Sequence, residues 1–527
     1  MPKKFNVTGV CIPEQNYMVD ISGKIDTIIR DYIQEGKYFT INRARQYGKT
    51  TTLYLLEERL KEDYLVIRLS FEAADELFLS LYALAAGLVR RINRVLKMEK
   101  VDQRLLDNWN QPLPEQFPFE EFGERITELC SNSEKKIILI IDKVDKSSDN
   151  QVFLSFLGLL RNKYLEQLQK NDCTFTSVIL AGVYDIKNLK IKLHPCEEPK
   201  YNSPWNIAVD FTVNMDFLPD DIATMLLEYE NDYHTGMDIV EISNLIYDYT
   251  SGYPYLVSRI CQLSDERLAG TEVFPSRQDV WTRKGIVAAE SLLRREAGTL
   301  FDDMVKKLTD YPELKQMLGN ILFNGNVYSF NKNNSLIDLG LTFGFIKDQN
   351  GIVAISNRIF ETEMYNLFLS EMEIDDTIGQ TSAMERNQYI VNGILQMRLV
   401  MEKFYQHFTE IYGNSDQKFI EKQGRKIFLL YLKPIINGTG NYYVEAQTRD
   451  MKRTDVIVDF RGKQSVIELK IWHGNEYNQR GEEQLFEYLD YYQADTGYLV
   501  SFNFNKNKKT GIKEIILRGK RIVEVVV

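Results

Sequence analysis

The chain has 527 residues and a formal net charge of −11, from 64 Lys and Arg against 75 Asp and Glu. At roughly 100–200 residues per domain, this length predicts three or four domains. With 44% hydrophobic residues, 12% aromatic residues and 13 prolines, the composition is that of folded domains and excludes a largely disordered chain. The 5 cysteines are scattered without a C-x-x-C pair, which argues against a disulfide framework or a zinc ribbon and favours a reducing cytoplasm.

We expect neither a membrane segment nor a histidine-rich metal site. The longest aliphatic run, Ile137–Ile141, is far shorter than the ~20 residues of a membrane span. The start of the chain lacks the apolar core of a signal peptide. The 4 histidines include no pair spaced four residues apart. The sequence therefore predicts a cytoplasmic protein with no membrane partner.

The net acidity argues at first sight against nucleic acid as a partner, but the charge is unevenly distributed. Residues 415–527 hold 19 Lys and Arg against 15 Asp and Glu, a net of +4, which leaves 45 basic and 60 acidic residues, a net of −15, in the remainder. This asymmetry indicates different partners for the two parts of the chain. Independent drift in the charge of two globular domains would give the same pattern.

Over the first 285 residues, β-branched runs alternate with helical periodicity, which predicts an α/β domain with a mostly parallel sheet. A helix over Thr50–Leu60 follows the first expected strand. The apolar residues are continuous in these strands, which is typical of strands covered on both faces. The expected strands are Tyr38–Asn42, Leu65–Leu69, Ile137–Ile141 and Val178–Ala181.

The remaining chain divides into three further segments. Residues 286–375 are predicted to be helical and to end in a hairpin, Gly344–Lys347 and Ile352–Ile355 around an Asn-Gly turn, and a closing helix, Ile359–Leu369. This order favours a winged-helix module. Residues 376–414 are predicted to form a helical connector. Residues 415–527 are predicted to run helix, strand, hairpin, strand, helix, strand.

A phosphate-binding turn is predicted between the first strand and its helix, where the sequence reads Asn-Arg-Ala-Arg-Gln-Tyr-Gly-Lys-Thr over residues 42–50. Gly48 lets the backbone approach phosphate oxygens, and the helix N-terminus directs N–H groups at them. Lys49 can reach the β- and γ-phosphates, and Thr50 can place its hydroxyl on Mg²⁺. The full pattern G-x-x-x-x-G-K-[ST] has glycine where this chain has Arg43, so an ordinary strand–helix turn is the alternative.

A hydrophobic strand that ends in Asp142 has the form of a Walker B segment, whose aspartate helps to hold Mg²⁺. Many ATPases place a glutamate next, which polarises the attacking water. Here the next residue is Lys143, and a cation cannot accept a proton from water at neutral pH. Either Asp145 or another carboxylate takes this role, or hydrolysis is slow and the nucleotide acts as a switch. We favour weak hydrolysis.

The N-terminal half resembles the bacterial AAA-like ATPases, a STAND/archaeal-ATPase-type branch of the P-loop NTPases. The resemblance covers about residues 10–375 and is carried by Tyr17–Asp20, Ile41–Thr51, Ile140–Asp145 and Thr250–Pro254. It implies that ATP and Mg²⁺ bind here, with Thr50 and Asp142 holding the ion. The ATP-binding residues that it implies are Arg45, Gly48, Lys49, Thr50, Thr51, Asp142, Asp145, Gly252 and Pro254.

The same resemblance indicates further positions around the nucleotide. Residues 252–254 match a G-x-P motif that lies near the adenine in such ATPases, and Ser177–Gly182 matches a strand that often carries a polar sensor. Arg161 and Arg259 are candidate γ-phosphate sensors, although exposed helix charges would look the same. An arginine contributed by a second copy would need a homo-oligomer, and the sequence leaves the oligomeric state open.

A second group of chemical residues lies in the C-terminal segment. Asp455 opens one predicted strand, and Glu468 and Lys470 close the next. Residues i and i+2 of a strand face the same side, so Glu468 and Lys470 point one way, and on a hairpin Asp455 can meet them. Two carboxylates form a hard oxygen site for Mg²⁺ or Mn²⁺. The lysine can orient or deprotonate a water and stabilise charge on a phosphate.

On the following helix, Gln484 and Tyr488 lie at i, i+4 on one face. With the preceding residues they give the order D…E-x-K…Q-x-x-x-Y, which resembles a branch of the PD-(D/E)XK nuclease superfamily over residues 415–527. The proline that usually precedes the first aspartate is Thr454 here. The resemblance implies that Asp455, Glu468, Lys470, Gln484 and Tyr488 are catalytic and that the first two hold the metal.

Other residues around this group have two readings each. Glu445, on the preceding strand, could add a carboxylate. Aromatic residues could stack on bases, but core packing is the more common role. These are Tyr491, Tyr492, Phe502 and Phe504. The basic residues could contact phosphates without sequence preference. These are Arg449, Lys452, Arg453, Lys506, Lys508, Lys509, Lys513, Arg518, Lys520 and Arg521.

Taken together, the sequence predicts an α/β P-loop domain (1–285), a winged-helix domain (286–375), a helical connector (376–414) and an α/β PD-(D/E)XK nuclease-like domain (415–527). We expect an ATP-regulated, metal-dependent nuclease with DNA favoured over RNA, and defence against foreign nucleic acid is one setting for it. Two alternatives stay open. One is a nucleotide-dependent switch or scaffold that binds DNA or protein without cleaving, and the other is a motor ATPase.

Overall fold

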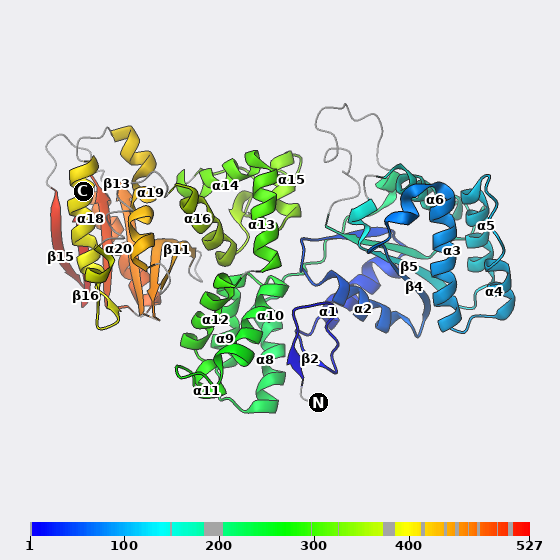
Figure 1. The fold of residues 1–527 in the computed structure, drawn as a ribbon, viewed down its shortest axis with the longest axis horizontal. Coiled ribbons are helices and arrows are strands. Elements are labelled where there is room, and N and C mark those ends of the chain that lie inside the picture. Colours follow the sequence, from blue (N-terminus) through cyan, green and yellow to red (C-terminus); the bar gives the residue numbers. More distant parts are fainter. Residues whose placement is uncertain are drawn as a thin grey trace. The chain divides into compact units, whose positions relative to one another are not determined.

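A computed structural model gives the fold of the chain (Figure 1). It describes residues 3–147, 150–183, 204–296, 298–324, 326–372, 385–412, 417–436, 440–447, 453–461, 463–471, 475–492, 494–503 and 510–527. The chain forms two compact units. The first comprises Met1–His234, Gly252–Gln262 and Leu341–Gly344, and the second comprises Thr235–Ser251, Leu263–Gly340 and Phe345–Val527.

The first unit is built around a parallel four-stranded sheet with the order β3-β6-β5-β4. The strands are β3 (Phe39–Asn42), β4 (Tyr64–Ser70), β5 (Lys136–Asp142) and β6 (Ser177–Gly182). These are the strands expected from the sequence, so the predicted α/β class with a parallel sheet is confirmed. Because parallel strands end at one edge, the loop after β3 and Asp142 at the end of β5 meet at the same edge of the sheet.

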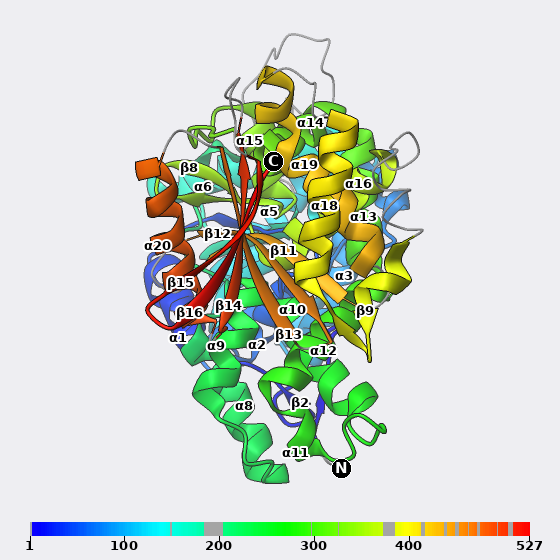
Figure 2. The same ribbon diagram turned by 90° about the vertical axis from the view of Figure 1, so that its left-hand side faces the viewer.

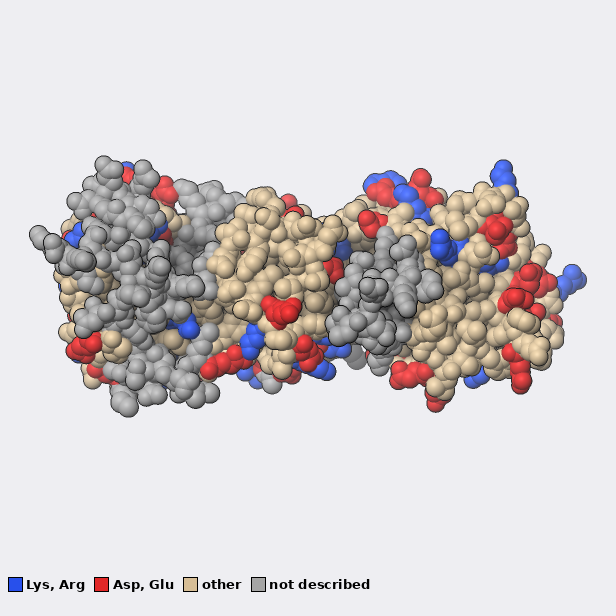
Figure 3. All heavy atoms as spheres, turned by 90° about the horizontal axis from the view of Figure 1, so that it is seen from above, with Lys and Arg blue, Asp and Glu red and all other residues tan. Residues whose placement is uncertain are grey.

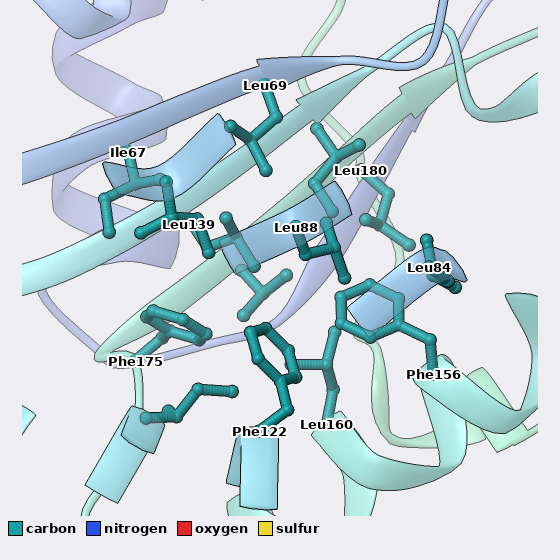
Figure 4. Packing of buried hydrophobic residues seen from close by; sticks show 14 of the residues in the cluster. Ile67, Leu69, Leu84, Leu88, Phe122, Leu139, Phe156, Leu160, Phe175 and Leu180 are labelled. Atoms are coloured by element: carbon teal, nitrogen blue, oxygen red, sulfur yellow. The ribbon is translucent and has the colours of Figure 1, made fainter. Parts of the chain in front are cut away.

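Helices cover both faces of this sheet. Alternate strand residues such as Ile67, Leu139 and Leu180 pack on one face against α3 (Leu81–Met98), α5 (Pro118–Asn132) and α6 (Gln151–Leu168), and Figure 4 shows this core. The other face meets α2 (Lys49–Leu60), whose buried residues are Thr52, Leu53, Leu56 and Leu60. Burial on both faces explains why the strand sequences are apolar without alternation.

The first unit also contains shorter elements. They are β1 (Lys4–Phe5), β2 (Asn16–Tyr17), α1 (Ser22–Ile28), η1 (Ile29–Ile33), η2 (Asp75–Leu79), α4 (Gln103–Trp109), η3 (Val144–Ser147), η5 (Pro204–Ile207), α8 (Pro219–Tyr233) and α10 (Pro254–Leu263). The N-terminal segment is fixed to α8 because the Tyr17 hydroxyl donates to Asp232 at 2.6 Å and Lys3 pairs with Glu228.

The second unit begins with helices and a hairpin. The helices are α9 (Ile239–Thr250), η6 (Ser264–Leu268), α11 (Arg277–Val280), α12 (Arg283–Arg295), α13 (Thr299–Asp310), α14 (Pro312–Asn324), α15 (Ser335–Thr342) and α16 (Arg358–Met372). The antiparallel strands β7 (Ile346–Gln349) and β8 (Ile352–Ile355) form the expected hairpin. Its two turn residues, Asn350 and Gly351, have φ of 55° and 82°, which is the geometry that Asn-Gly favours.

The segment predicted as a helical connector, residues 376–414, contains a short hairpin as well as a helix. Residues 373–384 and 413–416 lie outside the described part of the chain. Between them, β9 (Ile390–Val391) and β10 (Ile394–Leu395) form a hairpin before α18 (Met397–Tyr412). Asn392 and Gly393 have φ of 52° and 76°, so this turn again uses the left-handed conformation that Asn and Gly accept at low cost.

A mixed six-stranded sheet forms the end of the chain, with the order β11-β12-β13-β14-β16-β15. Figure 2 shows α20 on one side of this sheet and α18 and α19 on the other. The elements are α19 (Gln417–Ile436), β11 (Gly440–Gln447), β12 (Arg453–Phe460), β13 (Lys463–Ile471), α20 (Asn475–Tyr491), β14 (Thr496–Phe502), β15 (Gly511–Leu517) and β16 (Lys520–Val526). The order from α19 to β14 is the predicted one, and the closing hairpin β15–β16 was not predicted as such.

Charge and hydropathy are ordinary over the described part of the chain. On the face drawn in Figure 3, Lys and Arg lie interspersed with Asp and Glu among uncharged residues. Within the described ranges, no helix combines the length and apolarity needed to cross a membrane. The domain limits at residues 285, 375 and 414 stay predictions.

Candidate functional site

The predicted phosphate-binding turn joins β3 to α2 in the first unit. Gly48 caps α2 with φ of 75°, a conformation that L-residues with a side chain adopt at a cost. The side chain of Pro254 lies 3.8 Å from the position that a Cβ on Gly48 would take. The G-x-P segment therefore lies against the turn. The first N–H groups of α2 lack partners within the helix and suit an anion.

Lys49 is held at the centre of this turn. Its ammonium donates to the backbone carbonyl oxygens of Arg43 at 2.8 Å and of Ala44 at 2.7 Å. Burial lowers the pKa of Lys49 to about 8, and the nearby carboxylates of Asp145 and Asp142 oppose this shift. Lys49 is thus mostly protonated at neutral pH, and the two carbonyls hold it where a phosphate could take their place.

Thr50 and Asp142 are brought together from α2 and β5. The Thr50 hydroxyl donates to Oδ2 of Asp142 at 3.1 Å, and the other carboxylate oxygen accepts from the Lys143 N–H at 2.8 Å. Asp142 is 4% exposed, so its carboxylate is fixed on both sides. A hydroxyl and a carboxylate oxygen are ligands that Mg²⁺ prefers, so these two residues fit the ion that the sequence implies.

Lys143 and Asp145, the two ionisable residues that follow Asp142, contact different parts of the domain. Lys143 has φ of 63°, and its ammonium lies 3.9 Å from Oε1 of Glu72. Asp145 turns toward β6, where its carboxylate accepts from the Val183 N–H and lies so close to Gly182 that a Cβ there would be 2.5 Å from Oδ1. Asp145 therefore links the Walker B segment to the next strand.

Arg43, which replaces the first glycine of the full motif, is directed away from the turn. Its guanidinium donates to the carbonyl oxygens of Asn42 at 2.9 Å and Val213 at 3.0 Å and lies 5.4 Å from the centre of the Phe211 ring. Burial lowers the pKa of Arg43. The arginine at this position thus links the loop to the segment around Val213.

Two other predicted nucleotide residues have local partners. The Thr51 hydroxyl accepts from the Cys11 N–H at 3.1 Å, which fixes the N-terminal segment to α2. Arg45 is exposed, and its carbonyl oxygen accepts from the Tyr253 hydroxyl. A role for both in nucleotide binding stays a prediction.

Gly252 is required by close packing. Its φ is 76°, and a Cβ would lie 2.1 Å from the carbonyl oxygen of Phe217. The Phe217 N–H donates to the Gly252 carbonyl at 2.9 Å. A side chain at position 252 would therefore displace the segment that holds Pro254 against the turn.

A tyrosine pair next to this glycine was missed by the sequence reasoning. The rings of Tyr47 and Tyr253 meet edge to face, with centres 4.7 Å apart, and the Tyr47 hydroxyl donates to Asp216. Burial of Tyr47, together with the adjacent Asp216 carboxylate, raises its pKa well above the usual range. Tyr47 stands inside the phosphate-binding motif, but nothing in the sequence shows which residues it meets.

The proposed sensors are placed as follows. Ser177 begins β6, the strand matched to the sensor strand, and lies at the end away from the turn, where it donates to the Lys37 carbonyl oxygen at 2.6 Å. Arg259 lies on α10 and donates to Gln262 at 2.6 Å. Arg161 is half-buried on α6.

A cavity of about 550 Å³ lies beside this site, at α1, α2 and α8. The part of α2 that lines it lies more than one helical turn beyond the phosphate-binding loop. Residues 18–20 of the Tyr17–Asp20 motif also line it. The other lining residues are Lys3, Pro13, Ile21, Ser22, Ile25, Asp26, Leu55, Arg59, Thr224, Leu227, Glu228 and Asn231.

In the second unit, four of the five predicted catalytic side chains form one hydrogen-bonded chain. Lys470 lies 3.0 Å from Oε1 of Glu468, which is 1% exposed, and also donates to Oε1 of Gln484 at 3.0 Å. Gln484 in turn donates to the Tyr488 hydroxyl at 2.8 Å. The chain of contacts runs from β13 to α20 and fixes the lysine between an acidic and an amide oxygen.

The local sequence explains this arrangement. Val466, Glu468 and Lys470 alternate on β13 and share the face that α20 covers. Val466 packs there with Leu485, Tyr488 and Leu489 of α20, together with residues of β14 and β16. This apolar contact fixes α20 on the strand, so that Gln484, one residue before Leu485, reaches Lys470.

Asp455 is on β12, but its side chain lies outside what the structure describes. On the backbone, Val456 pairs with Ile467 in the antiparallel β12–β13 register, so Asp455 precedes one member of this pair and Glu468 follows the other. The side chain of Glu445 on β11 is also outside the described part. Among the residues that are described, no group of three or more His, Cys, Asp or Glu is arranged to hold a metal.

Many of the basic and aromatic candidates likewise fall outside the described residues or side chains: Arg449, Lys452, Arg453, Tyr491, Phe504, Lys506, Lys508 and Lys509. The four remaining basic residues contact other residues of the same chain. Lys513 pairs with the buried Glu524, and Lys520 donates to the carbonyl oxygens of Leu489 and Ala494 at 3.1 Å. Arg518 lies over the ring of Phe486 and Arg521 lies near Glu514, while Phe502 is buried.

Comparison with solved structures gives matches at low sequence identity. The chain is similar to the Walker-type ATPase PABY2304 of Pyrococcus abyssi, with 13% identity, 68% of this chain and 99% of that chain covered, and a TM-score of 0.45. It is also similar to the Aeropyrum pernix ORC2 protein in its ADPNP–ADP complexes, with 12% identity, 70% and 96% coverage and a TM-score of 0.37. The Aeropyrum pernix ORC1 protein in complex with DNA gives 12% identity, 67% and 94% coverage and a TM-score of 0.32.

Comparison with curated proteins gives no match. A family model for the AAA-like domain matches residues 15–363, well over half of the chain, and these residues include the phosphate-binding turn, Asp142 and the G-x-P segment. The chain belongs to the AAA-like domain family.

Proposed function

We propose that the chain is an ATP-regulated, metal-dependent nuclease that hydrolyses phosphodiester bonds, in DNA rather than RNA. The AAA-like domain binds ATP at Gly48, Lys49 and Thr50. The C-terminal sheet carries the cleavage site. The observation that carries this proposal is the bonded chain Glu468, Lys470, Gln484 and Tyr488, since four residues from two elements match the order of one nuclease branch.

The strand register supports the fifth residue. Val456 pairs with Ile467 on antiparallel strands, and Asp455 directly precedes Val456 while Glu468 directly follows Ile467. Asp455 and Glu468 would hold Mg²⁺ or Mn²⁺, which when bound polarises a phosphate oxygen and lowers the pKa of a coordinated water.

The protein residues have distinct tasks in cleavage. Lys470, fixed by Glu468 and Gln484, orients the attacking water and stabilises negative charge on the phosphate as the bond breaks. Gln484 positions the lysine because its Oε1 accepts a hydrogen bond from the Lys470 ammonium. Tyr488 positions Gln484 because its hydroxyl accepts a hydrogen bond from the Gln484 amide. A lysine side chain without hydrogen-bond partners would sample many conformations. The contacts with Glu468 and Gln484 therefore hold the Lys470 ammonium in one position, as a catalytic site requires.

Regulation follows from the nucleotide site. Lys49 would exchange its bonds with the Arg43 and Ala44 carbonyls for bonds with phosphate oxygens, and Thr50 and Asp142 would hold Mg²⁺. Helices α13–α16 with the hairpin β7–β8 correspond to the winged-helix domain proposed for residues 286–375. The membership of the AAA-like family is equally compatible with an active motor ATPase, which is the second candidate.

Cleavage assays with the full chain test the proposal. Asp455→Ala and Glu468→Ala should each abolish cleavage of DNA with Mg²⁺ or Mn²⁺ while ATP binding is retained. Thermal melting checks that the variants are folded. Unchanged cleavage in both variants would show that the assigned site is wrong, and absence of cleavage in the wild type over the whole metal series would favour the binding switch.

A further inference from the structure

The AAA-like site lacks a carboxylate directly after Asp142, and the structure indicates where one can come from. Lys143 occupies that position, with φ of 63°, and its ammonium lies 3.9 Å from Oε1 of Glu72. A protonated lysine cannot take a proton from water. If the site hydrolyses ATP, another carboxylate at the same edge of the sheet has to act as the base.

Glu72 lies at that edge because of the strand order. It follows β4, which is the direct neighbour of the Walker B strand β5. Ser70, the last residue of β4, pairs with Asp142, and the next residue, Phe71, donates its N–H to the Asp142 carbonyl oxygen at 3.0 Å. Glu72 therefore directly follows Phe71, the residue after β4 that bonds to the backbone of Asp142.

The backbone at Glu72 is fixed, whereas its side chain is open to water. Phe71 is fully buried, with its ring 5.3 Å from that of Phe78, and Ala73 has φ of 51°. The Glu72 N–H donates to Ser70 Oγ at 3.2 Å. The side chain of Glu72 is nevertheless 67% exposed, so a water molecule can reach its carboxylate.

Asp142 and Asp145, the described carboxylates of the Walker B segment, are already engaged in other contacts. Asp142 accepts from Thr50 and from the Lys143 N–H, and both contacts suit a metal-holding role. Asp145 accepts from the Val183 N–H and is wedged against Gly182. Removal of a proton from water needs a carboxylate with a free face, and Glu72 fits this need better than Asp142 or Asp145.

We propose that Glu72 is the general base for ATP hydrolysis, which rests on the proposed binding of ATP at Lys49. The water oxygen attacks the γ-phosphorus while its proton passes to the Glu72 carboxylate. The bond between the γ-phosphorus and the β–γ bridging oxygen breaks, and ADP leaves with that electron pair. Inorganic phosphate departs, and Glu72 returns the proton to solvent. Lys143 keeps the Glu72 carboxylate near the Walker B segment. The residue that stands in place of the usual glutamate thus positions the base.

Phosphate release from ATP tests this assignment in the full chain, with and without DNA. Glu72→Gln should lower kcat by about 100-fold or more, the usual contribution of a general base, and leave the Kd for ATP within about threefold. Glu76→Gln is the matched control, since Glu76 is an exposed glutamate one turn further on, and it should keep the wild-type kcat.

The contrary results are distinct. A Glu72→Gln protein that turns over like the wild type, with loss in Asp145→Asn instead, would assign the base to Asp145 and overturn the proposal. A wild type that binds ATP and releases no phosphate under either condition would overturn it as well, while leaving the nucleotide switch intact. Failure of the wild type to bind ATP would refute the proposed nucleotide function itself.

Discussion

The hydroxyl of Thr50 lies 3.1 Å from Oδ2 of Asp142, although 92 residues separate them in the sequence. Thr50 lies in the first turn of α2, after the phosphate-binding turn. Asp142 ends β5, and β6 lies between β5 and the strand β3 that precedes the turn. The contact shows that the two motifs read from the sequence form one site at the edge of the parallel sheet.

This contact predicts how the Mg²⁺-dependent part of ATP affinity responds to substitution. Thr50→Ala and Asp142→Asn should each remove most of the difference in Kd for ATP between Mg²⁺ and EDTA, because both oxygens hold the same ion. The double variant should lose little more than the worse single variant. Thr27→Ala is the control, because its hydroxyl donates to the Gly23 carbonyl oxygen within α1, and it should keep the difference. Additive losses would contradict a shared ion.

Affinity for ATP should depend on pH through Lys49. Burial lowers its pKa to about 8, so in the free protein the ammonium is lost as the pH rises through this value. Bound phosphate favours the charged form, and the Kd for ATP should therefore rise from pH 8 to pH 10. Titration calorimetry on the wild type and Lys49→Arg measures this, because an arginine stays charged over that range. An equal rise in Lys49→Arg would show that another group is responsible.

Gly252 should be far less tolerant of substitution than a glycine with similar φ in open space. Gly252→Ala adds a Cβ at 2.1 Å from the Phe217 carbonyl oxygen, whereas Gly9, with φ of 70°, has nothing within 4 Å. Left-handed strain costs about 1–2 kcal/mol at both positions, and the clash adds about 1–3 kcal/mol at Gly252. Chemical denaturation of both alanine variants measures the difference. Equal losses would mean that the Phe217 segment moves freely.

The sequence alone predicted those parts of the fold that depend on a short local pattern of residues. The strand–turn–helix around Gly48, the strand ending in Asp142 and the Asn350-Gly351 hairpin all formed as expected, because apolar runs and left-handed turn residues act over a few positions. On β13, the period of two placed Glu468 and Lys470 together, and the helical period placed Gln484 and Tyr488 on one face.

Contacts between distant segments were beyond such patterns. Nothing around Arg43 shows that Val213 accepts its hydrogen bond, and Tyr47 gives no sign of its contact with Tyr253. Glu72 was overlooked because its relation to Asp142 depends on which strands are neighbours. The β9–β10 hairpin was a different kind of miss, since Asn392-Gly393 is a turn signal that the helical reading of the connector passed over.

Lys470 and Lys463 offer a matched pair for the cleavage site, because both are lysines of β13. Lys470→Ala should lower the cleavage rate by about 100-fold or more, since it removes the charge that Glu468 and Gln484 position, while exposed Lys463→Ala should have little effect. Gel analysis of DNA fragments over time measures both rates. Equal effects would indicate that the lysines only bind DNA.

The most direct test is cleavage of defined single- and double-stranded DNA by the full chain, with Mg²⁺, Mn²⁺ or EDTA, and with or without ATP. We expect cleavage that needs a divalent metal, changes with ATP, and disappears in Glu468→Ala. Cleavage that persists in EDTA or in Glu468→Ala, or ATP binding with no cleavage under any of these conditions, would contradict an ATP-regulated, metal-dependent nuclease.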